Sequence, residues 1–477
     1  MRAAANPGSF RDPAARVYEL RASGAERPPR RVLRGLDAEA HEALLALLAA
    51  PFWQDAARRG QVVKTTLLDP EADADAAAIR AEGWAGVAEH AVVPFVSYPY
   101  EWSFAMLRDA ALLQLDLTEA ALRAGFTTKD ATPYNIQFVG HRPVFIDAPS
   151  FVRRAEGAPW VAYRQFCAMF LTPLMLHAHL GLDHRPVLRS ALDGVSPTEA
   201  QAYFRGFARL KAGVLSHVTL PAMVERMIAG RERDDAPAAK RTGAKQSDAM
   251  VIGLVQSLRR TVERCRLPAA RSDWDAYEAT HSYEAADAEA KRAFVVDAVT
   301  RTARDEVWDL GSNTGAYARA AAAHARRVVA LDADHAAIDR LYGRLAEGGE
   351  ANVLPLVMNL ANASPSQGWA GRERLAFDRR GAPDIVLCLA LIHHLRIGAN
   401  VPVASFLDWL ASLRAEVVIE FVSREDAMVR KLLTNREDVF SDYHQDVFER
   451  EATARFAVIA RTPLKEGTRT LYHLAPR

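Results

Sequence analysis

The sequence predicts an α/β domain in the C-terminal half of the chain and a separate α+β domain in the N-terminal half. Its 477 residues are more than one hydrophobic core usually serves. From about residue 295, short apolar strands alternate with helical segments, as in a parallel sheet covered by helices on both faces. Between the halves, residues 231–247 carry charges, small residues and Pro but no large apolar side chain, so we place the linker there.

Composition excludes several classes of protein. Half of the residues are hydrophobic and a quarter are charged, which argues against a disordered chain. The net charge of +1 provides no overall field that would attract nucleic acid or an acidic membrane. The three cysteines form no CxxC pair, so neither a disulfide framework nor a metal site is expected. Without a signal-like apolar start or an apolar run of about 18 residues, we expect a cytoplasmic protein.

The N-terminal elements follow from periodicity. Residues 1–36 contain Pro and Arg clusters and no sustained pattern, so we expect a flexible arm before an α+β domain over 37–230. The clearest helix is WSFAMLRDAALLQLDLTEAALRAG, which ends at Gly125. NIQFVG and RPVFID flank a polar turn and predict a hairpin. Residues 160–230 are expected to be helical, with a capping box at Ser196-Pro197-Thr198-Glu199, and 248–269 to form a connecting helix.

The C-terminal domain, over 270–477, contains seven strand-like segments. Helical patterns at 316–325 and 336–346 separate the first three of them. The last two segments are expected to form a late antiparallel pair. The seven are EVWDL, RVVALD, NVLPLVMN, DIVLCLAL, EVVIEF, RFAVIAR and RTLYHLA.

A glycine-containing turn follows the first strand of this domain. Asp309-Leu310-Gly311-Ser312-Asn313-Thr314-Gly315 leads directly into a helix. Ligands of open α/β sheets bind at the carboxyl ends of the strands, and glycine lets the backbone approach them closely. The second strand ends at Asp332, 21 residues after Gly311 (332 − 311), where a carboxylate can accept hydrogen bonds from both hydroxyls of a ribose. Asn313 and Ala316 stand where a dinucleotide fingerprint has its second and third Gly, which disfavours a dinucleotide.

The turn resembles motif I of class I S-adenosylmethionine-dependent methyltransferases, an acidic residue followed by Gly-x-Gly-x-Gly. Asn313 replaces the middle Gly, and Asn is one of the few residues that tolerate a positive φ. The resemblance implies a Rossmann-like seven-stranded methyltransferase sheet and S-adenosylmethionine as cofactor. It also implies cofactor-binding roles for Asp309, Gly311, Ser312, Asn313 and Gly315 near the methionine part, Asp332 at the ribose, and Asn359 and Leu360 beside the adenine.

Candidate catalytic residues follow the fourth and fifth strands. DIVLCLALIHHL places His393 and His394 just past the carboxyl edge, where a neutral imidazole can remove a proton from an acceptor hydroxyl. The pair resembles the His-His-Leu of small-molecule methyltransferases, which implies a base, although capping and packing roles are the alternative. Glu420 is the third candidate. It is expected either to orient a His or bind substrate, or to form a structural ion pair with Arg424 or Lys431.

Other polar and aromatic residues suggest contacts around this site. Tyr277, Tyr283 and Lys291 precede the sheet and are candidate lid contacts, with a place in the core as the alternative. Tyr443 and His444 are candidate acceptor contacts, although an ordinary polar surface explains them equally well.

The segments GSNTG, NASPSQGW and EFV resemble nodulation-type methyltransferases. That resemblance implies a saccharide-like or other small-molecule acceptor. We further expect O-methylation and an N-terminal domain that assists acceptor recognition. No nucleic-acid partner is expected, since no aromatic-plus-basic module is visible.

The segment TTKDATPYNIQFVGHRPVFIDAPSF resembles the catalytic and metal-binding loops of kinase-like phosphotransferases. In that family the residues matching Asp130, Asn135 and Asp147 accept the substrate proton and hold magnesium, and Lys64 would face the phosphates with Glu82 or Glu89 as partner. The chain lacks a Gly-rich phosphate loop and the His two residues before Asp130. Three readings therefore stand: a methyltransferase, a bifunctional kinase-methyltransferase, and a non-catalytic module that binds the cofactor. A helix-turn-hairpin with incidental carboxylates is the alternative for the N-terminal segment.

Overall fold

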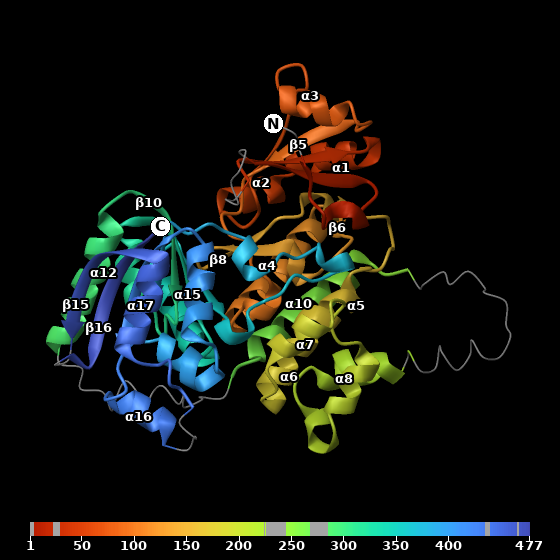
Figure 1. Ribbon diagram of the computed structural model, residues 1–477. Helices are drawn as coiled ribbons and strands as arrows, with labels where there is room; N and C mark the ends of the chain where they lie inside the picture. Colours follow the sequence, from red (N-terminus) through yellow and green to blue (C-terminus); the bar gives the residue numbers. More distant parts are fainter. Residues whose placement is uncertain are drawn as a thin grey trace. The chain divides into compact units, whose positions relative to one another are not determined.

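The computed structural model divides the chain into two compact units (Figure 1). Unit 1 comprises Met1–Phe138, Pro143–Ala270 and Gln367–Arg374, and unit 2 comprises Val139–Arg142, Arg271–Ser366 and Leu375–Arg477. The structure describes residues 4–21, 29–223, 225, 245–267, 285–434, 439–464 and 467–477. Most of the expected linker, 231–244, and the lid candidates Tyr277 and Tyr283 lie outside the described residues. No helix within the described ranges is both long and apolar enough to span a membrane.

Unit 1 begins with a five-stranded antiparallel sheet, in the order β1-β2-β3-β5-β4. Its strands are β1 Ala4–Ala5, β2 Ala15–Leu20, β3 Arg31–Leu36, β4 Thr65–Leu67 and β5 Gly86–His90. The expectation of a flexible arm over 1–36 is therefore wrong. Tyr18, Leu20 and Leu33 point from these short strands into a core with Ile79 and Val87. The alternation spans too few residues to stand out among the Arg and Pro residues of the segment.

The long helix of unit 1 is confirmed. α4, Phe104–Arg123, begins at Ser103, whose hydroxyl accepts a hydrogen bond from the Met106 N–H, and the chain then turns at Gly125 with φ 76°. α10, Asp248–Arg264, packs against α4 and carries the ion pair Arg259–Asp116 at 2.8 Å. The shorter helices that precede α4 are α1 Ala38–Leu48, α2 Pro51–Arg58 and α3 Ala74–Arg80.

The rest of unit 1 is mostly helical, as expected. Three helical segments follow one another without interruption: α5 Tyr163–Phe166, a π-helical segment Cys167–Leu171 and α6 Thr172–Leu180. Two further helices come next, α7 His184–Ser190 and α8 Pro197–Tyr203. The capping box is confirmed, because Ser196 and Glu199 exchange hydrogen bonds at the start of α8. The hairpin is also confirmed as the pair β7 Ile136–Val139 and β8 Arg142–Phe145, next to a second pair of β6 Phe126–Thr128 and β9 Phe151–Arg153.

Unit 2 contains a seven-stranded sheet, as predicted, in the order β12-β11-β10-β13-β14-β16-β15. The five strands from β12 to β14 are parallel, and β16 runs antiparallel to both of its neighbours, which confirms the late antiparallel pair. The bounds are β10 Arg304–Leu310, β11 Ala325–Asp332, β12 Val353–Val357, β13 Ile385–Cys388, β14 Glu416–Val422, β15 Phe456–Leu464 and β16 Arg469–Pro476.

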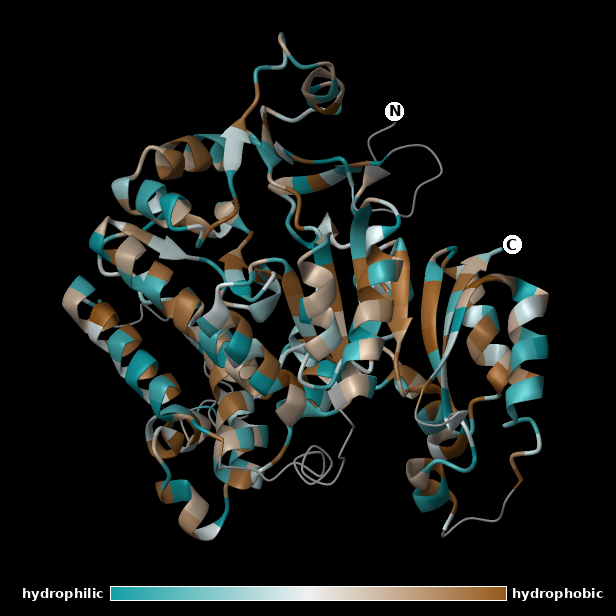
Figure 2. Cartoon of the chain, turned by 90° about the vertical axis from the view of Figure 1, so that its left-hand side faces the viewer, coloured by the Kyte–Doolittle hydropathy of each residue, from teal (hydrophilic) through white to brown (hydrophobic). Residues whose placement is uncertain are grey.

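Helices bury the inner strands of this sheet. Three helices share one hydrophobic core with the strands, namely α12 Ala285–Thr300, α13 Ala316–Ala322 and α14 His335–Gly348. α15 Val403–Ser412 packs against α17 Gln445–Arg455, and α16 Ala427–Leu433 follows β14. In Figure 2 the central strands are mostly hydrophobic and the flanking helices carry both hydrophobic and hydrophilic residues. The carboxyl ends of β10, β11, β12, β13 and β14 therefore share one edge, where the predicted site residues follow the strands.

Candidate functional site

The turn after β10 has the backbone conformation that the motif requires. Gly311, Asn313 and Gly315 adopt φ values of 81°, 49° and 81°, so Asn313 takes the left-handed conformation in place of a glycine. The N–H groups of Gly311 and Ser312 both donate to the Leu331 carbonyl, at 2.8 and 2.9 Å. This turn is therefore fixed against the end of the neighbouring strand, β11.

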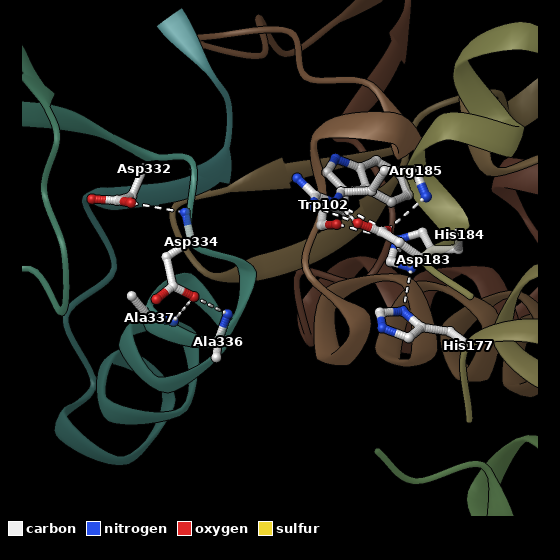
Figure 3. A network of polar contacts seen from close by, with 9 residues as sticks. All are labelled: Trp102, His177, Asp183, His184, Arg185, Asp332, Asp334, Ala336 and Ala337. Carbon is white, nitrogen blue, oxygen red and sulfur yellow. Dashed lines mark hydrogen bonds and ion pairs between the residues drawn. The ribbon is translucent and has the colours of Figure 1, made fainter. Parts of the chain in front are cut away.

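Asp332, at the end of β11, joins the turn directly. One carboxylate oxygen accepts from the Asn313 N–H at 2.8 Å, and the other accepts from the Asp334 N–H at 2.8 Å. Asp334 in turn accepts from the N–H groups of Ala336 and Ala337 and caps α14 (Figure 3). Each carboxylate oxygen offers two lone pairs, so Asp332 keeps acceptor capacity after both of these bonds.

Asp309 lies at the base of the turn with its side chain buried. Burial, followed by the negative charge of Asp332, raises the pKa of Asp309 to about 7, and a bond from the Ala318 N–H opposes that rise. Burial likewise raises the pKa of Asp332. Two carboxyl groups close together in a low-dielectric site favour a ligand that brings positive charge.

Several buried acceptors and donors around the turn have no hydrogen-bond partner among the described residues. They are Asp309 Oδ2, Ser312 Oγ and Asn313 Oδ1. Buried polar atoms are nearly always paired in native proteins, so three unpaired atoms within five residues indicate a place where a ligand binds. The turn is also closely packed against the protein, because a Cβ at Gly311 would approach Leu391 to 3.3 Å and one at Gly315 would lie 2.3 Å from Leu341.

Asn359 and Leu360 follow β12 at the same edge. The Asn359 side chain accepts from the Ala361 N–H at 3.0 Å and caps a short 3₁₀ turn, Leu360–Asn362. Leu360 lines a cavity of about 310 Å³. Its walls are mainly apolar and are formed by Leu360, Ala363, Ser364, Ala376, Phe377, Asp378, Leu395, Val401, Ser405, Phe406 and Trp409.

His393 and His394 follow β13, with their ring centroids 4.2 Å apart and their ring planes tilted by 39°. His393 is fully buried, and neither of its ring nitrogens has a partner among the described residues. Burial, then the neighbouring His394 and the cation of Arg469, hold the pKa of His393 well below its usual range. His394 is only partly buried, and its pKa is lowered by burial and by Arg469. Both rings are therefore neutral near pH 7, which is the form that accepts a proton.

Glu420 forms an ion pair, but with partners other than those expected. It is fully buried in β14 and contacts Lys291 Nζ at 2.7 Å and Arg469 Nη1 at 3.3 Å. Arg469 also pairs with Asp426 at 2.8 Å. Pairing with Arg424 or Lys431 is thus wrong, and Arg424 donates instead to the Phe440 carbonyl. The four side chains, two cations and two carboxylates, form a buried cluster of balanced charge, which we call the β14 charge cluster.

Of the remaining candidates, Lys291 takes its alternative position in the core, whereas Tyr443 takes a position that was not expected. Lys291 lies buried within the β14 charge cluster and is not an exposed lid residue. Tyr443 is also fully buried, and its hydroxyl donates to the Val422 carbonyl at 2.6 Å, so it contributes to the core. His444 is exposed at the start of α17. Sequence reasoning missed Arg469 and Asp426, because no local pattern connects them to Glu420.

The kinase-like residues of unit 1 lie partly together. Asp130 and Asp147 are close enough that the Asp147 charge, after burial, raises the pKa of Asp130. The Asn135 carbonyl accepts from the Ile146 N–H, and the Asn135 amide nitrogen is buried without a partner among the described residues. Asp147 itself pairs with Arg34 at 2.5 Å.

Lys64 and its expected partners do not form the arrangement suggested from sequence. The Lys64 side chain is exposed. Glu89 pairs with Arg31 at 2.8 Å, and Glu82 accepts from the Tyr18 hydroxyl at 2.5 Å. Both carboxylates therefore form their contacts with side chains of unit 1 other than Lys64.

Solved structures show weak similarity to the chain. The N-methyltransferase NodS from Bradyrhizobium japonicum WM9, in complex with S-adenosyl-L-homocysteine, is 12% identical with a TM-score of 0.31, over 43% of this chain and 93% of NodS. WbdD is 16% identical with a TM-score of 0.30, over 43% of each chain. Geranyl diphosphate methyltransferase, in complex with S-adenosylmethionine, is 12% identical with a TM-score of 0.30, over 39% and 85%. These values are too low to establish a common fold by themselves.

Sequence comparison gives a much stronger relationship. No family model matches the chain. The nodulation protein NoeA of Rhizobium meliloti strain 1021 is 32% identical over 471 residues, which is 98% of this chain and 94% of NoeA. A similarity that spans both units at this level is a property of homologous proteins. The chain belongs to the family of the nodulation protein NoeA.

Proposed function

We propose that unit 2 is an S-adenosylmethionine-dependent methyltransferase of class I. The observation that carries this proposal is the bond from the Asn313 N–H to Asp332, which joins a glycine-containing turn and an acidic residue at the tips of neighbouring parallel strands. Ligands of open α/β sheets bind at this edge. The sheet order, with one antiparallel strand between β14 and β15, supports the resemblance to methyltransferases that the turn suggests.

The residues at this edge fit S-adenosylmethionine. The unpaired polar atoms of Asp309, Ser312 and Asn313 offer acceptors for an ammonium group, and the negative charge of the two carboxyl groups favours a cationic ligand. Asp332 keeps lone pairs for the ribose hydroxyls. Leu360 provides an apolar wall for the adenine. When bound, the cofactor supplies a methyl group on a positively charged sulfur.

The acceptor side of the site contains the neutral pair His393 and His394. We assign the base role to this pair, with His394 in direct reach of an acceptor because only its ring is partly exposed. A base that takes the proton from an acceptor hydroxyl during methyl transfer typically contributes about 10²- to 10⁴-fold in rate. Glu420 does not touch either ring through any contact within the described residues. We therefore assign it to support of β14 through the β14 charge cluster.

We further propose a saccharide-like hydroxyl as the acceptor, with unit 1 assisting its recognition. A neutral imidazole base suits a hydroxyl, whose proton must leave as the new bond to carbon forms. The membership of the chain in the NoeA family of nodulation proteins supports a small-molecule acceptor related to nodulation.

Cofactor binding is tested by calorimetric titration of the full chain with S-adenosylmethionine. Asp332→Asn should weaken binding on the order of 10- to 150-fold, because hydrogen bonds to a charged group contribute about 1.5 to 3 kcal/mol. Asp334→Asn is the matched control: it lies two residues away and caps α14, a role that Asn fills equally well, so its affinity should equal that of the unaltered chain. Absence of binding in the unaltered chain, or equal affinity in Asp332→Asn, would refute the cofactor assignment.

Catalysis is tested by transfer of a labelled methyl group from S-adenosylmethionine into saccharide fractions of a cell extract. Labelled product that depends on the chain supports an enzyme. Label that resists alkali is expected for a methyl ether on a hydroxyl, and release of the label by alkali would argue against an ether. Tight cofactor binding without any labelled product would instead favour the non-catalytic module.

The cavity beside Leu360 is assigned to the adenine end of the cofactor. Ala363→Trp fills that cavity with an indole ring. If the adenine lies there, the variant should lose cofactor binding while keeping its far-ultraviolet circular dichroism. Retained cofactor binding with lost methyl transfer would reassign the cavity to the acceptor.

Phosphotransfer by unit 1 is a second candidate function, favoured by one observation. Asp130 and Asp147 lie close together. Asn135, whose amide nitrogen is unpaired among the described residues, directly precedes β7, and Asp147 follows β8, the partner strand of β7. A magnesium ion at Asp147 would have to share that carboxylate with Arg34. ATP turnover that requires magnesium and disappears in Asp147→Ala would support this function, and turnover unaffected by that change would exclude it.

A further inference from the structure

Three side chains of the types that bind metal ions lie close together between the end of α6 and the start of α7. His177 lies in the last turn of α6, which ends at Gly181 with φ 69°. Asp183 caps the start of α7, and His184 is the first residue of that helix. A loop of only a few residues thus brings His177 against Asp183 and His184, as Figure 3 shows. Neither the cofactor site nor the kinase-like residues use this cluster.

The distances suit a metal ion. His177 Nδ1 and His184 Nδ1 lie 3.0 Å apart, and Asp183 Oδ1 lies 3.9 Å from His184 Nδ1. One ligand atom from each of the three residues falls within 4.8 Å of the others. Zinc–nitrogen and zinc–oxygen bonds of about 2.0 to 2.2 Å in a tetrahedral site place ligand atoms roughly 3.4 Å apart. Small side-chain adjustments therefore bring all three atoms to bonding distance of one ion.

The tautomer of His184 is set by its other ring nitrogen. His184 Nε2 lies 3.2 Å from the Trp102 carbonyl oxygen, which can only accept a hydrogen bond. Nε2 must therefore donate, which leaves the lone pair of the neutral ring on Nδ1, facing His177. Metal-binding histidines typically donate their second ring N–H to a carbonyl or carboxylate in this way, because the bond fixes the orientation of the ligand nitrogen.

Asp183 is also held in place by neighbouring donors. Arg185 donates to the Asp183 carboxylate through Nε, at 3.0 Å to Oδ2, and through its backbone N–H, at 3.0 Å to Oδ1. Carboxylates that bind metals are commonly hydrogen-bonded by such outer groups. Two imidazole nitrogens and one carboxylate oxygen are donor types that bind zinc.

The site is largely buried and yet reachable from solvent. His184 is fully buried. His177 is 9% exposed, and its ring centroid lies 5.4 Å from that of Phe104 with the two ring planes nearly perpendicular. The Asp183 side chain is 32% exposed, which leaves a path from solvent. Three protein ligands leave one position of a tetrahedral ion for water or another ligand.

We propose that His177, Asp183 and His184 form a binding site for a divalent transition-metal ion, of which Zn²⁺ is the best match to two imidazoles and a carboxylate. The competing account of the 3.0 Å contact is a hydrogen bond between two neutral rings, which requires no ion. The two accounts differ in what added metal does, so a direct titration separates them. The proposal does not depend on methyl transfer by unit 2.

The test uses the full chain after a chelator has removed any metal. In one experiment the chain is titrated with Co²⁺, whose visible absorption reports tetrahedral binding. In a second experiment Zn²⁺ is added and the thermal unfolding of the chain is measured. We expect one equivalent of Co²⁺ to produce the absorption, Zn²⁺ to displace it, and Zn²⁺ to raise the unfolding temperature, since an ion that binds only the folded state stabilises it. His177→Gln should abolish all three responses. Arg185→Gln should weaken Zn²⁺ binding about 10- to 100-fold, because it removes only an outer group.

Two variants keep the result interpretable. Asp183→Asn preserves the cap of α7, because Asn caps helices as well as Asp does, and should fold while binding Zn²⁺ more weakly. His179→Gln is the control, since His179 lies on the same helix but contacts the Ala212 carbonyl, and it should bind as the unaltered chain does. Absence of Co²⁺ absorption and of stabilisation by Zn²⁺ in the unaltered chain would overturn the proposal. Equal binding by His177→Gln and the unaltered chain would do the same.

Discussion

Asp309 is a single carboxyl group whose protonation should control both the stability of the fold and the affinity for the cofactor. Its pKa is raised to about 7, first by burial and then by Asp332. The ordinary pKa of an aspartate is 3.8, and the pKa of Asp309 in the folded chain lies above it. Preference for the protonated form therefore stabilises the fold fully below about pH 3.8, and this contribution is lost as the pH rises through about 7. Asp309→Asn should therefore reduce the decline of stability between about pH 4 and pH 7, as measured by urea unfolding.

Protonation of the same carboxyl group should also make cofactor binding depend on pH. S-adenosylmethionine carries positive charge, which favours the ionised form of Asp309. Its affinity should rise with pH by up to tenfold per unit below about pH 7 and level off above that value. Calorimetry from pH 6 to pH 8 measures this trend, and Asp309→Asn should flatten it. A steep rise that persists in Asp309→Asn would assign the titration to another group.

The two histidines after β13 should differ in what their removal changes. His394→Gln is expected to lower kcat about 10²- to 10⁴-fold while leaving cofactor affinity nearly constant, because a base acts on the acceptor. His393 is fully buried among the cations of the β14 charge cluster, so His393→Gln should chiefly lower stability. Kinetics and thermal unfolding of both variants give the comparison. The reverse pattern would make His393 the base.

At the scale of elements, Gly315 links the turn to the helices that follow it. It starts α13 with φ 81°, and an added Cβ would lie 2.3 Å from Leu341 of α14. Gly349 ends α14 with a similar φ of 75°, but an added Cβ there meets nothing within 4 Å. Ala at either position pays about 1 to 2 kcal/mol for the left-handed backbone, and overpacking adds about 1 to 3 kcal/mol at Gly315 alone.

The pair therefore makes a matched experiment. Gly315→Ala should lower the free energy of unfolding more than Gly349→Ala does, and it should also weaken cofactor binding. Denaturant unfolding and calorimetry give both quantities. Equal losses in the two variants would mean that α14 moves freely away from the turn, in conflict with the close packing of this site.

Helices and inner strands were predicted more accurately from sequence than the first strands of unit 1. α4 repeats its apolar positions over 20 residues, so the pattern outweighs local exceptions. β2 and β3 contain six residues each and lie among Arg and Pro residues. A strand this short gains its stability from neighbours in the sheet, and its own sequence carries too few alternations to reveal it.

At the scale of the whole molecule, the β14 charge cluster connects segments far apart in the chain. Lys291 and Glu420 are separated by 129 positions, and Glu420 and Arg469 by 49. Glu420→Gln leaves a buried cation without its partner, which should cost about 3 to 5 kcal/mol of stability. Adding Lys291→Met to that variant restores the charge balance and should recover a large part of the loss.

Denaturant unfolding of the single and double variants measures this coupling. Asp408→Asn is the control, since Asp408 forms an exposed ion pair with Arg455 in the same unit, and it should leave the free energy of unfolding nearly unchanged. If the double variant is no more stable than Glu420→Gln, the cluster does not act as a balanced set of charges.

The sequence by itself determined the order of the strands and helices of unit 2, the turn from Asp309 to Gly315, and Asp332 at the end of the second strand. These features depend on neighbours within a few residues, because periodicity, caps and positive φ values are local properties of the backbone. Local patterns therefore predicted the cofactor edge of the sheet.

Only the tertiary structure decided which distant side chains meet. It paired Glu420 with Lys291 and Arg469, buried Tyr443 in the core, and set His177 against His184. The physical reason is that ion pairs, buried hydrogen bonds and metal ligands depend on distances in space. Chain folding brings these groups within a few ångströms of each other, whereas periodicity describes only one element at a time.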